Sequence, residues 1–429
     1  MYLGIDFGTT GARAIAIRSA EYPEVVADSR FAFSVVPESH LTEMWRSALF
    51  ELLDRLSNDI REQLQAIAIN GTSGTVLKCD RSGRPLTPPL LYNDKRAAGL
   101  VAELKDIAPA RSLVLSASST LTKVLWLTRN EDRLSDRLCL HQADWLASLL
   151  HGRPGVTDYH NCLKLGYDVT ELRYPDWLQE MAIAPVLPDV VAPGSDLGCV
   201  TPNIARKFGL PANCMVRAGT TDSIAAFWAS GANEVGDGVT SLGSTLAIKL
   251  LSADRVEDAR YGIYSHRFGD RWLAGGASNT GGAVLKQFFS DAELRQLSTE
   301  IEGDRPSPLD YYPLTQPGER FPINDPNLPP RLSPRPERDI DFLHGLLESM
   351  ARIEAQGYEL LQQLGASPIR RVYSAGGGAV NETWTRIRSR HLGVPLVLPQ
   401  HVEAAYGTAL LAAREAFGGA IPLNPTTII

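Results

Sequence analysis

Cysteine is scarce in this chain of 429 residues, and its few positions follow neither a disulfide pattern nor a zinc pattern. The five cysteines are Cys79, Cys139, Cys162, Cys199 and Cys214. Their number is odd, their spacings are wide, and no CxxC pair occurs. A disulfide framework and a structural zinc site both need closely patterned cysteines, so neither is expected. A reducing compartment fits best, and we expect a cytoplasmic protein.

Long apolar runs and an excess of basic residues are also missing. No stretch of 18 apolar residues occurs, so we expect no transmembrane helix. The first strand-like segment begins at Tyr2, which leaves no room for a signal peptide. The formal net charge of −7 argues against binding to nucleic acid or to an anionic membrane. A phosphate-bearing ligand would therefore depend on local backbone amides and a metal ion.

The common nucleotide-binding and metal-binding fingerprints are absent as well. Neither GxxxxGK[ST] nor GxGxxG occurs in the chain. None of the eight histidines falls in an HExxH spacing. If the protein binds a nucleotide, it must use a different phosphate cradle.

The composition is that of a globular protein, with 44% apolar and 21% charged residues. The length is sufficient for two domains. Residues 2–17 and 239–251 both predict a strand, a short turn built from Gly, Ser and Thr, and a second strand. These two hairpins lie about 235 residues apart, which indicates two topologically related domains.

The remaining periodicity predicts an α/β order of elements. Helices are predicted at 42–57, 97–107, most of 120–150, 339–364, 380–393 and 403–418. Further strands are predicted at 66–70, 76–80, 214–219, 370–378 and 394–399. Residues 305–336 hold ten of the 28 prolines and are expected to form a surface excursion of the second domain.

Four short segments carry the residue types that phosphoryl chemistry needs. Asp6-Phe7-Gly8-Thr9-Thr10-Gly11 offers exposed amides, two hydroxyls and a carboxylate for a metal ion. Leu242-Gly243-Ser244-Thr245 offers similar donors in the second half. Each hairpin taken alone could be a glycine turn that binds no ligand. The occurrence of two such hairpins is harder to explain in that way.

The other two segments join a strand to a helix. In Gly219-Thr220-Thr221-Asp222-Ser223, the carboxylate of Asp222 is either a helix N-cap or a general base at a strand end. The run from Ala375 to Asn381 contains three glycines, which allow a ligand to approach the backbone closely.

These four segments, in this order, resemble those of the FGGY carbohydrate kinases, within the actin, Hsp70 and sugar kinase fold superfamily. The resemblance covers nearly the whole chain. It extends to TKVLWLTRN (122–130), ADWLASLLHGRPGVTDYHN (143–161), GGASNTGGAVLKQF (275–288) and GERFPINDP (318–326). Within the family, the chain looks most like the D-ribulose kinases of cyanobacteria and plant plastids, a xylulose kinase-like subgroup.

The resemblance implies a two-domain α/β fold of the ribonuclease H-like type, with a cleft between the domains. Residues 1–222 would form the sugar-binding domain, and residues 223–429 the nucleotide-binding domain. The helix at 403–418 would pack back on the first domain. The partners would be ATP, Mg²⁺ and a sugar, and the protein would be a monomer or a homodimer.

The resemblance also implies a role for each matching position. Asp222 would be the general base, and Asp6 would organise Mg²⁺ and the reacting phosphate. The sugar would be bound by Thr72, Ser73, Asp6, Asp222 and Asp94. The phosphates would be bound by Thr9, Thr10, Gly243, Ser244 and Thr245, and the adenosine by Gly376, Gly377 and Asn381.

Several functions remain open at this stage. Many xylulose and glycerol kinases carry a Gly-Gln pair where this chain has Gly71-Thr72-Ser73, which favours D-ribulose over their substrates. The alternatives are a kinase for another ketose or polyol such as D-xylulose, and a nucleotide-gated ATPase of the actin and Hsp70 kind. A sugar-binding regulator without catalysis is disfavoured by Asp6 and Asp222.

Overall fold

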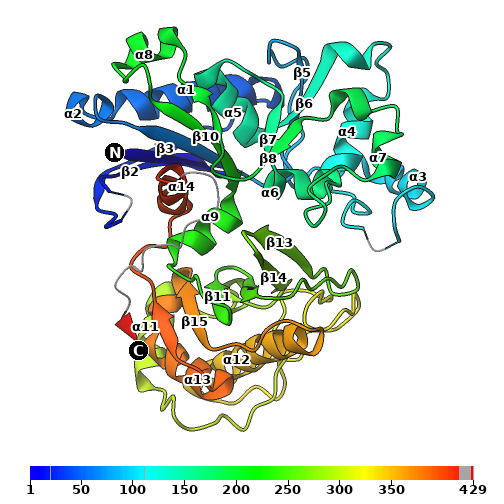
Figure 1. Cartoon of the computed structure of the whole chain (residues 1–429). Coiled ribbons are helices and arrows are strands. Elements are labelled where there is room, and N and C mark those ends of the chain that lie inside the picture. Colours follow the sequence, from blue (N-terminus) through cyan, green and yellow to red (C-terminus); the bar gives the residue numbers. More distant parts are fainter. Residues whose placement is uncertain (20, 111, 415–426, 429) are drawn as a thin grey trace. The chain divides into compact units, whose positions relative to one another are not determined.

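A computed structural model describes residues 1–19, 21–110, 112–414 and 427–428. The chain forms two compact units (Figure 1). Unit 1 contains Met1–Ala229 and the segment that starts at Glu403, and unit 2 contains Ser230–Val402 with a short C-terminal strand. The division at 229/230 lies slightly beyond the expected boundary of 222. Within the described residues, no helix has both the length and the apolar character needed to cross a membrane.

Unit 1 is built on a six-stranded sheet in the order β3-β2-β1-β4-β10-β9. The strands are β1 Tyr2–Phe7, β2 Gly11–Ile17, β3 Val25–Ala32, β4 Ala66–Gly71, β9 Asp196–Cys199 and β10 Met215–Thr221. Strands β1, β4 and β10 are parallel neighbours, so their carboxyl ends meet at one edge. The antiparallel hairpin β1-β2 continues into β3.

Helices cover both faces of this sheet. The alanines of β2 and the apolar residues of β1 face a core that includes α1 (Leu41–Asp54), α5 (Gln142–His151) and α8 (Pro202–Phe208). The isoleucines of β2 face α14 (Ala404–Ala412) on the opposite side (Figure 1). A Cβ atom at Gly4 would lie 2.1 Å from the backbone nitrogen of Ala409, so only glycine lets α14 approach β1 this closely.

Residues 72–195 add short elements beside the main sheet. Strands β5 (Val76–Asp80) and β6 (Arg137–His141) pair with each other, and β7 (Val156–Asp158) pairs with β8 (Asp189–Val191). The remaining helices of unit 1 are α2 Asn58–Arg61, α3 Val101–Lys105, α4 Thr120–Thr128, α6 Tyr159–Cys162, α7 Asp176–Gln179 and α9 Asp222–Ala229.

Unit 2 repeats the same plan around a sheet in the order β13-β14-β12-β11-β15-β16-β17. Its strands are β11 Asp237–Leu242, β12 Leu246–Ser252, β13 Tyr264–Phe268, β14 Arg271–Ser278, β15 Arg371–Ala375, β16 Leu396–Leu398 and β17 Thr427–Ile428. Its helices are α10 Gly282–Leu285, α11 Asp291–Glu300, α12 Asp339–Gln363 and α13 Glu382–Leu392. Strands β14, β12, β11, β15 and β16 match β3, β2, β1, β4 and β10 in order and direction. The topological relationship expected from the two hairpins is therefore confirmed.

Some expected elements are wrong in extent or type. The stretch 120–150 is mostly helical, as expected, but β6 separates α4 from α5 and was not expected. Strand β3 was not expected. The proline-rich segment forms no helix and no extended strand, but it is not merely a surface excursion, because Tyr311 and Phe321 are fully buried. Of the helix expected at 403–418, α14 accounts for Ala404–Ala412, and residues 415–418 lie outside the described part of the chain.

Candidate active site

The first group of candidate residues lies at the carboxyl edge of the parallel strands of unit 1. Asp6 is in register with Asn70 on the neighbouring strand, and Thr220 is in register with Asn70 from the other side. Asp222 follows directly after β10 and opens α9. This sheet order therefore brings together one carboxylate from the start of the chain and one from more than 200 residues later.

Asp6 is held in an environment that disfavours its charge. Burial and the nearby charge of Asp222 raise the pKa of Asp6 to about 7, although Arg13 lowers it. The buried Oδ1 atom of Asp6 has no hydrogen-bond partner among the described residues. A buried carboxylate oxygen without a donor is costly, and a cation would satisfy it.

Asp222 has the geometry of a helix-opening carboxylate. Its Oδ1 accepts a hydrogen bond of 2.7 Å from the backbone N–H of Ser223. The residue is half-buried. On the strand before it, the hydroxyl of Thr220 contacts Nδ1 of the buried His160 at 2.7 Å. A first-turn carboxylate at a strand end can both interact with the helix dipole and receive a proton, so the two interpretations of Asp222 are compatible.

The turn after β4 presents its two hydroxyl residues differently. Thr72 is buried, and its hydroxyl contacts Thr75 at 2.6 Å and Gln142 at 3.2 Å. The backbone N–H of Thr72 also donates to Oε1 of Gln142. Ser73 is half-buried. The Thr72 side chain therefore fixes the shape of the turn, whereas Ser73 is the more accessible of the two hydroxyls.

A buried lysine connects this turn to the segment that contains Asp94. The ammonium group of Lys123 donates to the carbonyls of Gly74, Leu91 and Tyr92 at 2.7–3.1 Å. Lys123 is fully buried within α4. Burial and the charge of Lys164 lower the pKa of Lys123 to about 8, although Asp94 raises it. The three carbonyl contacts hold two backbone segments at a fixed separation.

Asp94 is paired within its own loop. Burial raises the pKa of Asp94, but hydrogen bonds and charge from Arg96 outweigh burial, so the net pKa lies below the ordinary value. The carboxylate accepts from Nε of Arg96 at 2.8 Å, and Arg96 also contacts Glu38 at 3.0 Å. Asp94 therefore carries a negative charge that Arg96 already balances.

The second group of candidate residues lines a cavity of about 990 Å³ in unit 2. Four of the expected nucleotide-binding residues line it, namely Gly243, Ser244, Gly377 and Asn381. Thr245 and Gly376 are next to lining residues in the sequence. Thr9 and Thr10 belong to unit 1, where both side chains are exposed at the β1-β2 turn.

Glycine is required where the walls of this cavity meet. Gly376 adopts φ 84° and ψ 173°, and a Cβ atom there would lie 2.7 Å from the carbonyl oxygen of Leu242. Gly282 donates its N–H to the carbonyl of Gly243 at 2.8 Å, and Ala283 donates to that of Ser244. The β11-β12 turn and the start of α10 therefore form one continuous backbone surface.

Asn381 has a structural role in addition to its position on the cavity wall. Its Oδ1 accepts from the backbone N–H of Trp384, so it caps α13, and its amide donates to Ser298 at 2.9 Å. Thr383 also donates to the carbonyl of Ser298. These contacts fix α13 against α11.

Sequence reasoning missed most of the cavity wall. The α11 residues Asp291, Leu294, Arg295, Ser298 and Thr299 line it, as do Gly282, Leu285, Trp384 and Arg386. The only sequence signal was the resemblance in 275–288, which includes Gly282 and Leu285. Helix α11 lies about 80 residues before the glycine loop that it faces, so local sequence patterns do not connect the two.

Asp6 could hold a metal ion together with a bound ligand. Among the residues that the structure describes, no three His, Cys, Asp or Glu side chains are grouped to bind a metal. Mg²⁺ commonly uses one or two carboxylates together with substrate phosphates and water. The unsatisfied Oδ1 of Asp6 fits that mode of binding.

Comparisons with known proteins agree with this architecture. Residues 1–228 match the N-terminal domain of the FGGY family of carbohydrate kinases, and residues 238–416 match its C-terminal domain. A xylulose kinase of Streptomyces coelicolor is 29% identical, covering 97% of this chain and 88% of that protein. A gluconokinase of Bacillus subtilis is 22% identical, covering 94% and 85%.

Solved structures show the same fold. The crystal structure of a xylulose kinase from Rhodospirillum rubrum superposes with a TM-score of 0.79 at 22% identity, covering 99% of this chain and 94% of that one. The two family domains together span most of the chain. The chain belongs to the FGGY family of carbohydrate kinases and is an ATP-dependent sugar kinase.

Proposed function

We propose that the protein phosphorylates a ketopentose, converting D-ribulose to D-ribulose 5-phosphate. The observation that carries the proposal is the meeting of Asp6, Asp222 and the Gly71–Ser73 turn at one strand edge in a member of a sugar kinase family. A sugar would lie beside the two carboxylates, against the small hydroxyl residues of the turn. Unit 1 would bind the sugar, and unit 2 would bind ATP.

In the proposed mechanism, Asp222 receives a proton from the sugar hydroxyl. That oxygen attacks the γ-phosphorus of ATP, the bond from the γ-phosphorus to the β–γ bridging oxygen breaks, and ADP departs with the electron pair. Position and charge stabilisation supply most of the rate acceleration in such transfers. Mg²⁺ bound at Asp6 would neutralise charge on the phosphates.

The nucleotide would be held in the cavity of unit 2. The backbone at Gly243 and Ser244 and the hydroxyls of Ser244 and Thr245 would bind the phosphates, together with Thr9 and Thr10 from unit 1. Gly376 and Gly377 would let the adenosine approach the backbone. Asn381 would act by shaping the wall, because both ends of its side-chain amide are already engaged.

The names of several relatives favour xylulose as the alternative ketose. Asp94 would contribute to the binding of either sugar. A nucleotide-gated ATPase that needs no sugar has no supporting observation beyond the shared fold. The oligomeric state, monomer or homodimer, stays a prediction that light scattering on the purified protein would settle.

The test is ADP formation with MgATP in the presence of D-ribulose, D-xylulose, L-ribulose, ribitol, glycerol, gluconate or no sugar. Stimulation by D-ribulose well above every other sugar supports the proposal. Preference for D-xylulose would keep the mechanism and replace the substrate. ATP turnover that no sugar changes would reject the sugar site itself.

A further inference from the structure

The two loops of the nucleotide cavity stand on neighbouring strands. Strands β11 and β15 are parallel, with Thr240 in register with Ser374. Three residues beyond each of these positions lie Gly243 and Gly377, which line the cavity. A shift of one strand along the other would therefore change the distance between the two cavity walls.

A fully buried ion pair lies behind these two strands. Glu354 of α12 and Arg388 of α13 are both 0% exposed. Nε and Nη2 of Arg388 donate to the two carboxylate oxygens of Glu354 at 2.7 and 2.8 Å. This is the bidentate geometry in which arginine pairs most strongly with a carboxylate.

The same pair contacts both strands through hydroxyl groups. Nη1 of Arg388 donates to the hydroxyl of Ser374 at 2.7 Å. The hydroxyl of Thr240 donates to Oε1 of Glu354 at 2.5 Å and, in turn, lies 3.0 Å from the hydroxyl of Tyr358. One network therefore connects both loop-bearing strands with two helices.

Stability alone is a weak explanation for such a pair. Moving two charges out of water is expensive, and well-packed apolar residues often replace a buried ion pair without loss of stability. An apolar pair, however, could not form the directed hydrogen bonds that connect the position of one strand to that of the other. The retained charges are explained if they fix the register of the two loops.

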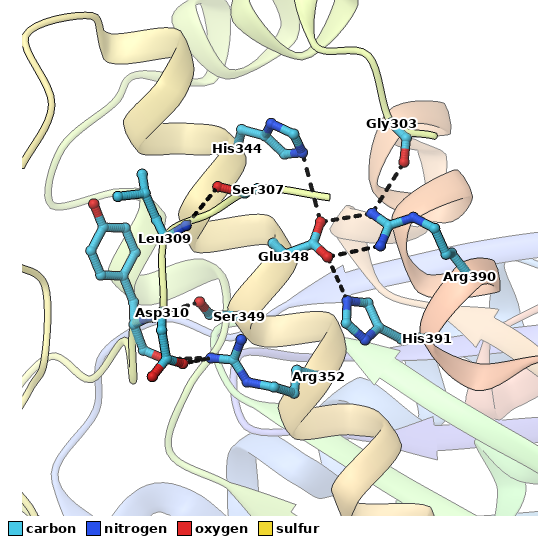
Figure 2. Close-up of polar contacts among 11 residues, drawn as sticks. Gly303, Ser307, Leu309, Asp310, His344, Glu348, Ser349, Arg352, Arg390 and His391 are labelled. Atoms are coloured by element: carbon cyan, nitrogen blue, oxygen red, sulfur yellow. Dashed lines mark hydrogen bonds and ion pairs between the residues drawn. The ribbon is translucent and has the colours of Figure 1, made fainter. Parts of the chain in front are cut away.

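A second ion cluster on the same two helices provides a contrast (Figure 2). The carboxylate of Glu348 on α12 contacts Arg390 at 2.7 Å and His391 at 2.7 Å on α13, and His344 lies on its other side at 3.6 Å. Arg390 also donates to the carbonyl of Gly303. Among the residues that the structure describes, none of these contacts reaches β11 or β15, so this cluster holds α12 to α13 without touching the strands.

We propose that Glu354 and Arg388 are positioning residues for the nucleotide, acting through Thr240 and Ser374 to set the spacing of the two cavity loops. The inference rests on the proposed nucleotide site in unit 2. It assigns no contact between these four residues and ATP. They would determine whether the backbone at Gly243 and the backbone at Gly377 can contact the same nucleotide simultaneously.

The test uses conservative variants that keep the ion pair, namely Thr240→Val, Ser374→Ala and the double variant. Ser349→Ala is the matched control, because this buried serine of α12 accepts one hydrogen bond, from the N–H of Tyr311, outside the network (Figure 2). The dissociation constant of ADP is measured by calorimetry on the full chain, together with the melting temperature and the KM values for ATP and sugar.

We expect each network variant to weaken ADP binding about tenfold and to raise the KM for ATP, with the KM for sugar unchanged. Ser349→Ala should lower the melting temperature about as much as the network variants do, but it should leave ADP affinity intact. Network variants that melt earlier yet bind ADP within twofold of wild type would overturn the inference and leave the nucleotide site standing. Failure of the wild-type chain to bind ADP would reject the nucleotide site, and this inference with it.

Discussion

Asp6 and Asp222 stand at the ends of two strands that are separated by a single strand, and the charge of Asp222 raises the pKa of Asp6. Two carboxylates close enough to affect each other, in different local settings, suit different tasks. Asp222 lies at a helix start, where a carboxylate interacts favourably with the helix dipole. Asp6 is partly buried, and its buried Oδ1 lacks a donor among the described residues.

Asp222→Ala should reduce sugar-dependent ADP formation by about 10²-fold or more, because the sugar hydroxyl would lose its proton acceptor. The measurement is the steady-state rate with MgATP and the best sugar of the panel. ADP affinity serves as the control and should change less than twofold, since the proposed nucleotide cavity belongs to unit 2. A variant with near wild-type turnover would remove Asp222 from the role of general base.

The activity should depend on pH through Asp6. Below a pKa of about 7 this carboxyl is neutral and a poor ligand for Mg²⁺, whereas above it the anion is available. The value of kcat/KM for MgATP should therefore rise as the pH increases through 7. Asp6→Asn should lose most of the activity and flatten this rise. A wild-type profile that is flat between pH 6 and 8, roughly one unit either side of that pKa, would contradict the assignment.

Stability without metal should show the opposite trend. The folded chain keeps a proton on Asp6 between its ordinary pKa of 3.8 and the raised value of about 7, whereas the unfolded chain has lost it. The contribution of Asp6 to the free energy of unfolding therefore falls as the pH rises through this range. The measurement is urea unfolding in EDTA. The free energy of unfolding of Asp6→Asn, relative to wild type, should be larger at pH 8 than at low pH. Asp59→Asn, at an exposed position, is the control and should show no such change. An equal effect of Asp6→Asn at both extremes would argue against the raised pKa.

Lys123→Met should damage both stability and sugar binding. The substitution leaves the carbonyls of Gly74, Leu91 and Tyr92 without their buried donor, which should cost about 3 kcal/mol or more in the free energy of unfolding. Surviving folded protein should show a raised KM for sugar with unchanged ADP affinity. Lys105→Met, on the exposed surface of α3, is the control and should change stability by less than about 0.5 kcal/mol. Equal stability of the two variants would show that the three contacts are dispensable.

Gly376→Ala should reduce stability and ADP binding far more than an alanine substitution at another glycine of positive φ. Gly376 occupies a backbone region that is essentially restricted to glycine, and a Cβ atom would meet the carbonyl of Leu242. We expect a loss of more than about 2 kcal/mol in the free energy of unfolding, together with weakened ADP binding. Gly393 ends α13 with φ 65° and has open space around it, so Gly393→Ala should cost about 1 kcal/mol and leave ADP binding intact. Similar losses at the two positions would contradict this account.

The sequence predicted those parts of the fold and site that depend on local patterns. Both hairpins, the helices α1 and α12, and the placement of Asp222 at a strand end follow from short-range spacing. Strand β6 was missed because its five residues lie between two helical patterns.

Other features depend on partners far away in the chain. The contact between the Thr72 hydroxyl and Gln142, 70 residues later, could not be predicted from local sequence, and the contact of Thr72 with a sugar stays a prediction. Arg388 lies in an arginine-rich stretch of the helix predicted at 380–393, yet it is fully buried against Glu354. Nothing in local periodicity distinguishes an exposed arginine from one that meets a carboxylate on another helix.

The packing of α14 imposes an order on folding during synthesis. This helix closes one face of the unit 1 sheet, and Thr408 within it accepts a hydrogen bond of 2.5 Å from Asn70, the residue between Asp6 and Thr220. Because α14 follows unit 2 in the chain, a ribosome has made all of Ser230–Val402 before unit 1 can be completed. The edge that carries the two carboxylates is thus finished last, so a truncated translation product would contain unit 2 without a complete unit 1.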